Sequence, residues 1–202
     1  MIDFRPILLT GQRARLVPME PDHAAGLWEA GRHPDIWRYM PVARPEALAD
    51  MQGLVRAALA EQARGTSLPF TIMDQETNAI VGSTRFLDIV PVHRQLEIGW
   101  TWLTPAAQRT RINTECKYLL LRHAFETLGL IRVQLKTDAR NERSQRAMER
   151  IGAIREGVLR RHRILPDGFV RDSVYYSVIV EEWPQAKAHL ERLLDRYASS
   201  DS

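Results

Sequence analysis

Residues 95–117 read QLEIGWTWLTPAAQRTRINTECK, and this stretch decides the fold. Within residues 95–103 the side chains alternate with the period of a β-strand. The alternation puts one set on each face, namely Leu96, Ile98, Trp100 and Trp102 against Glu97, Gly99, Thr101 and Leu103. The polar segment 104–112 predicts a loop, and apolar residues spaced four apart predict a helix over 113–128. The stretch is therefore a strand, a loop and a helix in direct succession.

The start of this helix is a candidate anion site. The first N–H groups of a helix have no partner within it, and the helix dipole favours negative charge there. Asn113 is a suitable N-cap, with Thr114 and Glu115 in the first turn. An ordinary connecting loop that binds nothing explains this window equally well.

The rest of the chain mixes strands and helices. Strands are predicted at 13–17, 68–73, 79–89, 132–137, 157–164 and 170–181. Helices are predicted at 20–30, 45–64, 143–150 and 184–197. Turn-forming residues at 74–78 and 165–168 predict two hairpins. Such mixing predicts an α/β domain with a mixed sheet rather than an all-parallel one.

Length and composition set broad limits. The 202 residues, 45% hydrophobic and 26% charged, fit one globular domain. Because no apolar run approaches 18 residues and the start lacks a signal-peptide layout, we expect a soluble, cytoplasmic protein that does not enter a membrane. The single cysteine, Cys116, excludes an internal disulfide and a multi-cysteine metal site, and no metal is expected. The polar tail at 198–202 is expected to be frayed.

The basic excess is local. The formal net charge is only +3, but nine arginines and four acids lie between Arg140 and Arg171. A docked anionic ligand and a solvated arginine-rich surface both account for this excess. Nucleic-acid binding is not expected, since it favours a longer basic stripe or interleaved aromatic residues.

A dozen short motifs follow one another in a fixed order. They are RLVP at 15–18, DIWRYM at 35–40, EIGWTWLTP at 97–105, NTECK at 113–117, HAFE at 123–126, RV at 132–133, TD at 137–138, NERS at 141–144, GA at 152–153, EG at 156–157, DGFVRD at 167–172 and EEWP at 181–184. In these motifs the chain resembles the GCN5-related N-acetyltransferase (GNAT) superfamily, in the branch of the RimJ/RimL type. The resemblance implies a single GNAT domain over 1–202 with its core at about 12–187, a mixed and partly splayed central sheet flanked by helices, and a C-terminal helix at 184–197.

The resemblance also implies acetyl-CoA, or another short acyl-CoA, as the cofactor. In this family the pantetheine arm lies between two parted parallel strands, here 95–103 and 132–137, and the pyrophosphate sits on the loop before the helix. The backbone N–H near Leu103 then polarises the thioester carbonyl, a role typically worth about 3 kcal/mol. Asn141 and Ser144 match the family's Asn-x-x-Ser, whose side chains reach the pantetheine and the departing sulfur. Local helix capping is an alternative use that does not exclude the other.

The pyrophosphate loop departs from the family pattern Gln/Arg-x-x-Gly-x-Gly/Ala. The candidate cofactor-binding residues here are Gln108, Arg109, Thr110, Arg111, Ile112 and Asn113. Arg111 replaces a glycine that permits close backbone approach. Its side chain would either crowd the phosphates or bind them through the guanidinium. A CoA-binding module with weakened or lost catalysis is therefore an alternative to an active enzyme.

The implied reaction moves an acetyl group to a neutral primary amine by direct attack in a ternary complex. Glu97 is the first candidate for the base, acting through a water, and pairing with a neighbouring Arg is the alternative. Many superfamily members carry a proton-donating Tyr four residues after Ser144, where this chain has Met148. Ser144 or a bound water is then the candidate donor. Cys116 is not expected to be a nucleophile, because it lies on the apolar row of its helix.

The expected acceptor is an α-amine of a protein, a peptide or a small molecule. Its pKa near 8 leaves it partly neutral in the cell, whereas a lysine amine near 10.4 needs a stronger base. Trp37, Tyr39 and Phe86 are candidates to line the acceptor pocket, and core packing is the alternative for each. Transfer from succinyl-CoA to a small amine is an alternative activity. A homodimer through the last hairpin and the terminal helix is left open.

Overall fold

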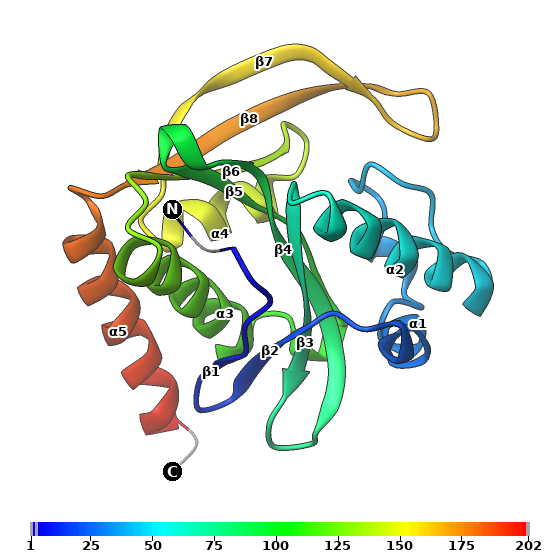
Figure 1. Ribbon diagram of the computed structural model, residues 1–202, viewed down its shortest axis with the longest axis horizontal. Helices are drawn as coiled ribbons and strands as arrows, with labels where there is room; N and C mark the ends of the chain where they lie inside the picture. The colour runs from blue at the N-terminus through cyan, green and yellow to red at the C-terminus, as the bar shows by residue number, and fades with distance from the viewer. Residues whose placement is uncertain (1, 3, 201–202) are drawn as a thin grey trace.

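The computed structural model describes residue 2 and residues 4–200. Its centre is an eight-stranded sheet in the order β1-β2-β3-β4-β5-β6-β8-β7 (Figure 1). The strands are β1 (Leu9–Thr10), β2 (Ala14–Pro18), β3 (Ser67–Asp74), β4 (Ala79–Val90), β5 (Gln95–Leu103), β6 (Arg132–Asp138), β7 (Ile154–Ile164) and β8 (Val170–Ile179). All neighbours are antiparallel except β5 and β6, which are parallel. The predicted mixed sheet is confirmed.

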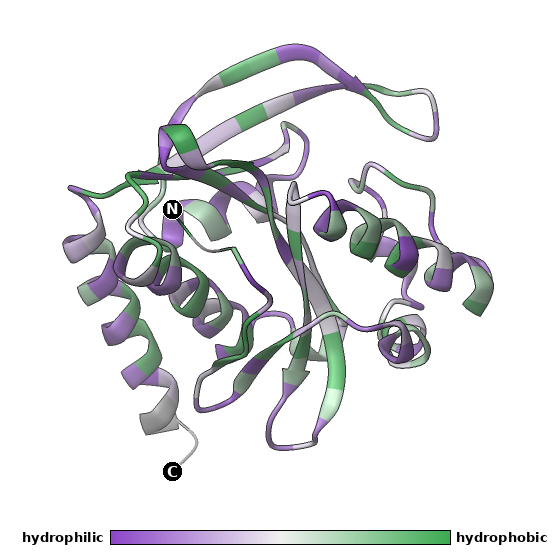
Figure 2. Ribbon diagram, viewed as in Figure 1, coloured by the Kyte–Doolittle hydropathy of each residue, from purple (hydrophilic) through white to green (hydrophobic). Residues whose placement is uncertain are grey.

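Two helical groups flank this sheet. The helices are α1 (Ala24–Ala30), α2 (Leu48–Ala63), α3 (Arg111–Arg122), α4 (Glu142–Arg150) and α5 (Trp183–Ser200). Figure 1 shows α3 and α5 on one side of the sheet and α1 and α2 on the other. In Figure 2, α5 turns its apolar residues mainly toward α3. None of the helices that the structure describes combines the length and apolar character needed to cross a bilayer.

Strands β5 and β6 part shortly after they begin. Their register pairs Gln95 with Arg132, Leu96 with Val133 and Glu97 with Gln134, and the pairing within the described chain stops there. Beyond this point β5 continues beside β4 and β6 beside β8. The expected splay is confirmed, and it leaves the facing edges of the two strands without each other as hydrogen-bond partners.

A bulge in β5 accompanies the splay. The register with β4 shifts between Ser83 and Arg85, and Trp100 has a φ of +51°. Because β5 has one extra residue here, the side chains after the bulge point to the face opposite to the one that simple alternation predicts. Leu103 therefore joins Leu96 and Ile98 in the core under α3, while Trp102 packs in the second core between α1, α2 and the sheet. The alternation predicted for residues 95–103 is wrong beyond the bulge.

Several predicted helix boundaries also change. Helix α3 begins at Arg111 with Thr110 as its N-cap, so Asn113 is not the cap. The helical chain after Arg122 continues as a π-helical turn, His123–Thr127, rather than as α-helix to residue 128. Helix α2 begins at Leu48 rather than at 45. Helix α5 extends to Ser200, beyond the predicted end at 197, and residues 201–202 of the predicted frayed tail lie outside the described residues.

Candidate active site

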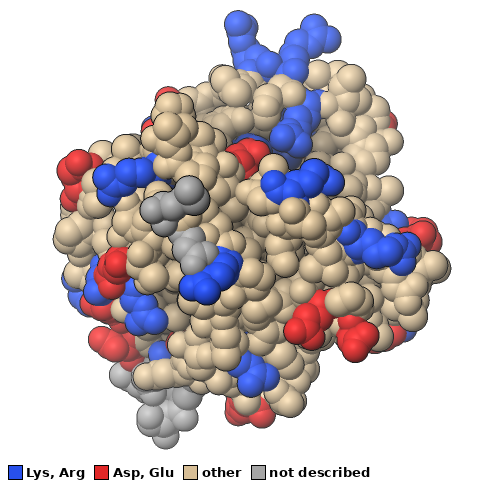
Figure 3. Space-filling view, viewed as in Figure 1, with Lys and Arg blue, Asp and Glu red and all other residues tan. Residues whose placement is uncertain are grey.

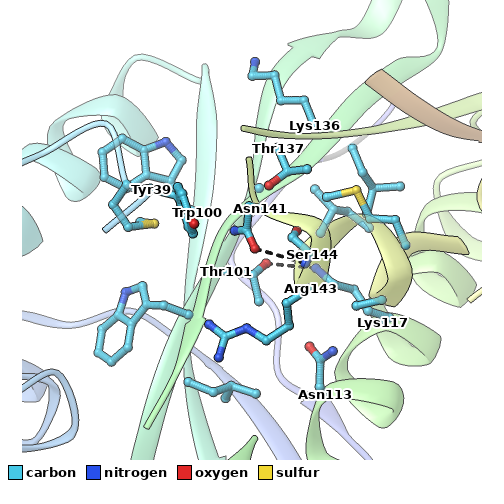
Figure 4. A pocket seen from close by; sticks show the side chains of 18 of the residues that line it. Tyr39, Trp100, Thr101, Asn113, Lys117, Lys136, Thr137, Asn141, Arg143 and Ser144 are labelled. Atoms are coloured by element: carbon cyan, nitrogen blue, oxygen red, sulfur yellow. Dashed lines mark hydrogen bonds between the residues drawn. The ribbon is translucent and has the colours of Figure 1, made fainter. Parts of the chain in front are cut away.

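A cavity of about 520 Å³ opens where β5 and β6 part. Figure 4 shows its labelled side chains coming from β5, β6, α3, α4 and the segment after α1. Most of the predicted site residues line it, namely Tyr39, Glu97, Leu103, Gln108, Arg109, Thr110, Asn113, Asn141 and Ser144. The cavity thus brings together residues that lie as far apart in the sequence as Tyr39 and Ser144.

The backbone of Leu103 faces the gap between the strands. Thr104 N–H donates to Val81 O on β4 at 2.8 Å. Since peptide groups along a strand alternate in direction, the N–H and C=O of Leu103 point the other way, toward β6. Gln108 Nε2 donates to Leu103 O at 2.9 Å from that side. The Leu103 N–H is therefore directed into the cavity.

The loop before α3 is held by its own side chains. Thr110 Oγ1 accepts from Ile112 N at 3.3 Å and donates to Ala107 O at 2.8 Å. Gln108 Oε1 accepts from Arg143 at 2.7 Å, which ties this loop to α4. Arg109 has a φ of +62°, the left-handed conformation that glycine adopts most easily. The loop thus keeps a glycine-like backbone without a glycine.

Two loop residues predicted to bind the cofactor do not line the cavity. Arg111 turns away from it, and its Nε lies 3.3 Å from Glu115 Oε1, one helical turn along α3. Glu115 is buried and also accepts the backbone N–H groups of the turn between β1 and β2, residues 12–14, at 2.6–2.9 Å. Ile112 is 2% exposed in the core. Because residue 111 is helical, its backbone has no need of glycine, and its side chain neither crowds nor reaches the cavity.

Helix α4 contributes a second helix start. Asn141 caps it, and its Oδ1 accepts from Ser144 N at 3.1 Å (Figure 4). The capping use of Asn141 is therefore observed, while both residues still line the cavity. Met148 lines it one turn further on, where a thioether offers no acidic proton.

Glu97 forms an ion pair across the parting strands. It is 2% exposed, and its Oε2 lies 2.7 Å from Lys136 Nζ and 2.9 Å from Gln134 Nε2. Burial raises the pKa of Glu97, and the Lys136 ammonium and the hydrogen bonds to it act in the opposite direction. The partner is thus a lysine from β6 and not the neighbouring Arg considered from sequence.

Lys117 is a cavity residue that sequence reasoning missed. It is 8% exposed, and its Nζ donates to Thr101 Oγ1 at 2.8 Å (Figure 4). Burial lowers the pKa of Lys117 to about 8. The sequence holds a signal for this burial. Lys117, Leu121 and Phe125 are spaced four residues apart, so Lys117 lies on the same buried face of the helix as the two apolar residues. The adjacent Cys116 is fully buried, and burial raises its pKa to about 12.

The aromatic candidates divide between cavity and core. Tyr39 lines the cavity and faces Arg140, whose guanidinium carbon is 5.5 Å from the ring centroid. Trp37 is 6% exposed, donates to Gly31 O at 2.7 Å and packs on Trp102, so it belongs to the core. Phe86 is fully buried against Phe70. Neither Trp37 nor Phe86 lines this cavity, because Trp37 fills the second core between α1, α2 and the sheet and Phe86 fills the main core.

The cavity wall is cationic. Among the described lining residues the acids are Asp35 and Glu97. The basic lining residues are Arg109, Lys117, Lys136, Arg143, Arg146, Arg150, Arg163 and Arg171. Such a surface favours an anionic ligand.

Comparisons with known proteins agree with this geometry. The acetyltransferase (GNAT) domain family matches residues 13–154. The chain is 39% identical to a proposed acetyltransferase from T. thermophilus, with a TM-score of 0.86 over 96% of this chain and 100% of that one. It is 33% identical over 109 residues to YdaF of Bacillus subtilis (strain 168), a proposed ribosomal N-acetyltransferase, covering 54% of this chain and 58% of YdaF. The structure of Mycobacterium smegmatis RimJ with CoA-disulfide shares the fold, with a TM-score of 0.81 at 22% identity over 93% of this chain and 95% of RimJ.

The family match spans most of the chain, and the mixed sheet with its parted parallel strands is the one expected of that family. The chain therefore belongs to the GCN5-related N-acetyltransferase (GNAT) family, and it resembles the family's RimJ/RimL branch.

Proposed function

We propose that this protein transfers an acetyl group from acetyl-CoA to a primary amine, by direct attack in a ternary complex. The observation that supports this most is the gap between β5 and β6, which runs from the ion pair at Glu97 to the N-terminus of α3. An amine and an acyl donor entering from opposite ends of one cavity meet in the middle of it.

The residues of the loop and of α4 fit an acyl-CoA. The first N–H groups of α3 and the guanidinium groups of Arg109 and Arg143 supply positive potential for a diphosphate. The Leu103 N–H, directed into the gap, suits a carbonyl oxygen on which negative charge develops. Bound acetyl-CoA would supply a thioester-activated acetyl group at this position.

In this proposal Glu97 and Lys136 act on the amine, and Ser144 acts on the sulfur. Glu97 accepts the amine's proton through a water, and Lys136 holds the carboxylate in place. Ser144, or a water beside it, returns a proton to the departing sulfur, since Met148 has none to give. The burial and raised pKa of Cys116 argue against an acyl-enzyme on this thiol.

An α-amine is the acceptor that this machinery suits best. With a pKa near 8, an α-amine loses its proton readily, and a single carboxylate base is enough. The pKa of a lysine amine is about two units higher, so a lysine amine needs a stronger base. The name of YdaF refers to ribosomal acetylation, which supports a protein or peptide N-terminus as the acceptor class here.

The test is acceptor profiling by free-thiol release. An unblocked peptide, the same peptide with a blocked N-terminus and an internal lysine, and a polyamine are each incubated with acetyl-CoA and, in parallel, with succinyl-CoA. We expect release with acetyl-CoA and the unblocked peptide. Absence of release from every pair would contradict the proposal, and a melting-temperature rise with CoA in that case would identify a CoA-binding module instead, since ligand at 100 times its Kd adds about 2.7 kcal/mol of stability.

A further inference from the structure

Two arginines form one wall of the cavity where the β7–β8 hairpin covers it. The register of the hairpin sets Arg163 on β7 directly opposite Arg171 on β8, and both side chains line the cavity. Arg171 is 6% exposed and lies deep, whereas Arg163 is exposed at the rim. Figure 3 shows basic side chains gathered at the top of the molecule, where Figure 1 places this hairpin.

Arg171 is buried without a counter-ion. Its Nε donates to Ser173 Oγ at 3.0 Å, a neutral partner, and no carboxylate among the described residues lies within 4 Å of its guanidinium. Asp138 influences it electrostatically but is already held by Arg140 through two bonds, at 2.8 and 3.0 Å. A buried cation without such a partner costs several kcal/mol, so a site of this kind is completed by an anion.

The acids of the cavity do not supply that anion. Glu97 is neutralised by Lys136 at 2.7 Å, so this pair adds no net charge to the wall. Asp35 lies on the segment after α1, and its side chain is 75% exposed. The hairpin side of the cavity therefore keeps a surplus of positive charge.

In the proposed function the acyl donor lies beside the loop before α3, and the wall lies away from that loop, where the acceptor would enter. Phe169, two residues before Arg171, is covered by Arg140, whose guanidinium carbon is 3.4 Å from the ring centroid, and Arg140 also faces Tyr39. Lys136, on the neighbouring strand, stands across the cavity from Asn113 in Figure 4. The arginine that is tied to the loop before α3 is Arg143, through Gln108.

We propose that the acceptor carries a carboxylate close to its amine, and that Arg171, helped by Arg163, binds this carboxylate and positions the amine. The acceptor class is thus a peptide with an acidic residue next to an unblocked N-terminus. A planar guanidinium suits a carboxylate through two parallel hydrogen bonds, and a phosphate through the same geometry. This inference rests on the proposed transfer to an amine and adds the identity of its substrate.

The test uses peptides that differ only at the second residue. Ala-Asp, Ala-Asn and Ala-phosphoserine N-termini on one neutral sequence are acetylated from acetyl-CoA, and kcat/KM is measured by thiol release. We expect the Asp peptide to exceed the Asn peptide by about tenfold or more. Arg171→Gln should bring this ratio close to one, and Arg163→Gln, at an exposed position, should lower it in part. Arg160→Gln, exposed on the same strand and outside the cavity lining, is the matched control and should keep the wild-type ratio.

Each other result has one meaning. Equal rates for Asp and Asn peptides would overturn this inference while leaving amine acetylation in place, and a preference for phosphoserine over Asp would overturn the carboxylate as the bound group. No activity on any amine would overturn the proposed function itself. The melting-temperature rise caused by CoA should be the same in Arg171→Gln as in the wild type, and its loss would assign Arg171 to the CoA phosphates and overturn the inference. If Arg171→Gln fails to fold, the Arg163→Gln ratio decides.

Discussion

At the scale of single residues, Lys117 makes stability depend on pH. Its pKa of about 8 in the folded protein lies below the ordinary 10.5, so the unfolded chain binds more protons between these values. The cost of burying the ammonium is fully present below pH 8 and is relieved as the pH rises toward 10.5. Lys117→Met removes the charge while keeping much of the volume, and its gain in free energy of unfolding should be about 2 kcal/mol larger at pH 7.5 than at pH 9.5. Urea denaturation of both proteins at both pH values measures this, and an identical pH dependence would contradict a buried, titrating Lys117.

Glu97 carries the second prediction at this scale. Because its pKa is raised by burial, the carboxylate gains a proton as the pH falls through a value above the ordinary 4.5, and the base is lost there. The acceptor amine also becomes protonated, so log(kcat/KM) should have a slope of two below both pKa values. Glu97→Gln should lower the rate by about 10²–10⁴-fold and leave a slope of one. The control is Glu29→Gln, which changes an exposed carboxylate on α1. A wild-type rate, or a slope of two, in Glu97→Gln would rule out Glu97 as the base.

At the scale of elements, the start of α3 is tested by a pair of glycine substitutions. Arg109 has a left-handed backbone and Arg111 a helical one, so glycine should affect them in opposite directions. Arg109→Gly should raise the free energy of unfolding by up to about 1 kcal/mol. Arg111→Gly should lower it by about 1–2 kcal/mol, through helix propensity and the lost contact to buried Glu115, with no gain in kcat/KM for acetyl-CoA. Thermal unfolding measures both. The reverse order of stabilities would contradict the backbone conformations of these two residues, and a more active Arg111→Gly would show that a side chain at 111 obstructs the phosphates.

Most helices and strands can be predicted from the sequence, but some of their details cannot. Strands, hairpins and helices follow from period and turn residues, which are local, and the motif order anticipates the parallel pair β5–β6 and its splay. The bulge at Trp100 does not follow, because an alternating run carries no sign of one inserted residue. The cap of α3 does not follow either, since Thr110 and Asn113 are both good capping residues and the choice rests on packing.

The candidate site also contains residues that the sequence predicts and residues that it does not. Leu103 in β5, and Asn141 and Ser144 at the start of α4, line the cavity as predicted. Arg111 does not, because its partner Glu115 is fixed by N–H groups about one hundred residues away, in the turn before β2 and at the first residue of β2. A contact of that separation leaves no local pattern in the sequence.

At the scale of the whole molecule, the β7–β8 hairpin bears on assembly. Strand β7 ends the sheet, and it exposes apolar side chains, with Ile154 54%, Leu159 49% and Ile164 75% exposed. A sheet edge that exposes several apolar side chains favours pairing with another chain. We expect a homodimer with twice the 23.2 kDa chain mass, and Leu159→Glu should shift it toward the monomer. Light scattering coupled to gel filtration measures the mass, and a monomeric wild type would contradict the expected dimer.

The proposed function requires that the gap between β5 and β6 binds CoA, and residue-resolved amide hydrogen exchange with and without CoA measures this binding at single N–H groups. We expect slower exchange on addition of CoA at Leu103 and at residues 111–113, where N–H groups face the cavity or open the helix, and unchanged exchange along β7. Binding of CoA with no protection at these amides, or no binding at all, would contradict it.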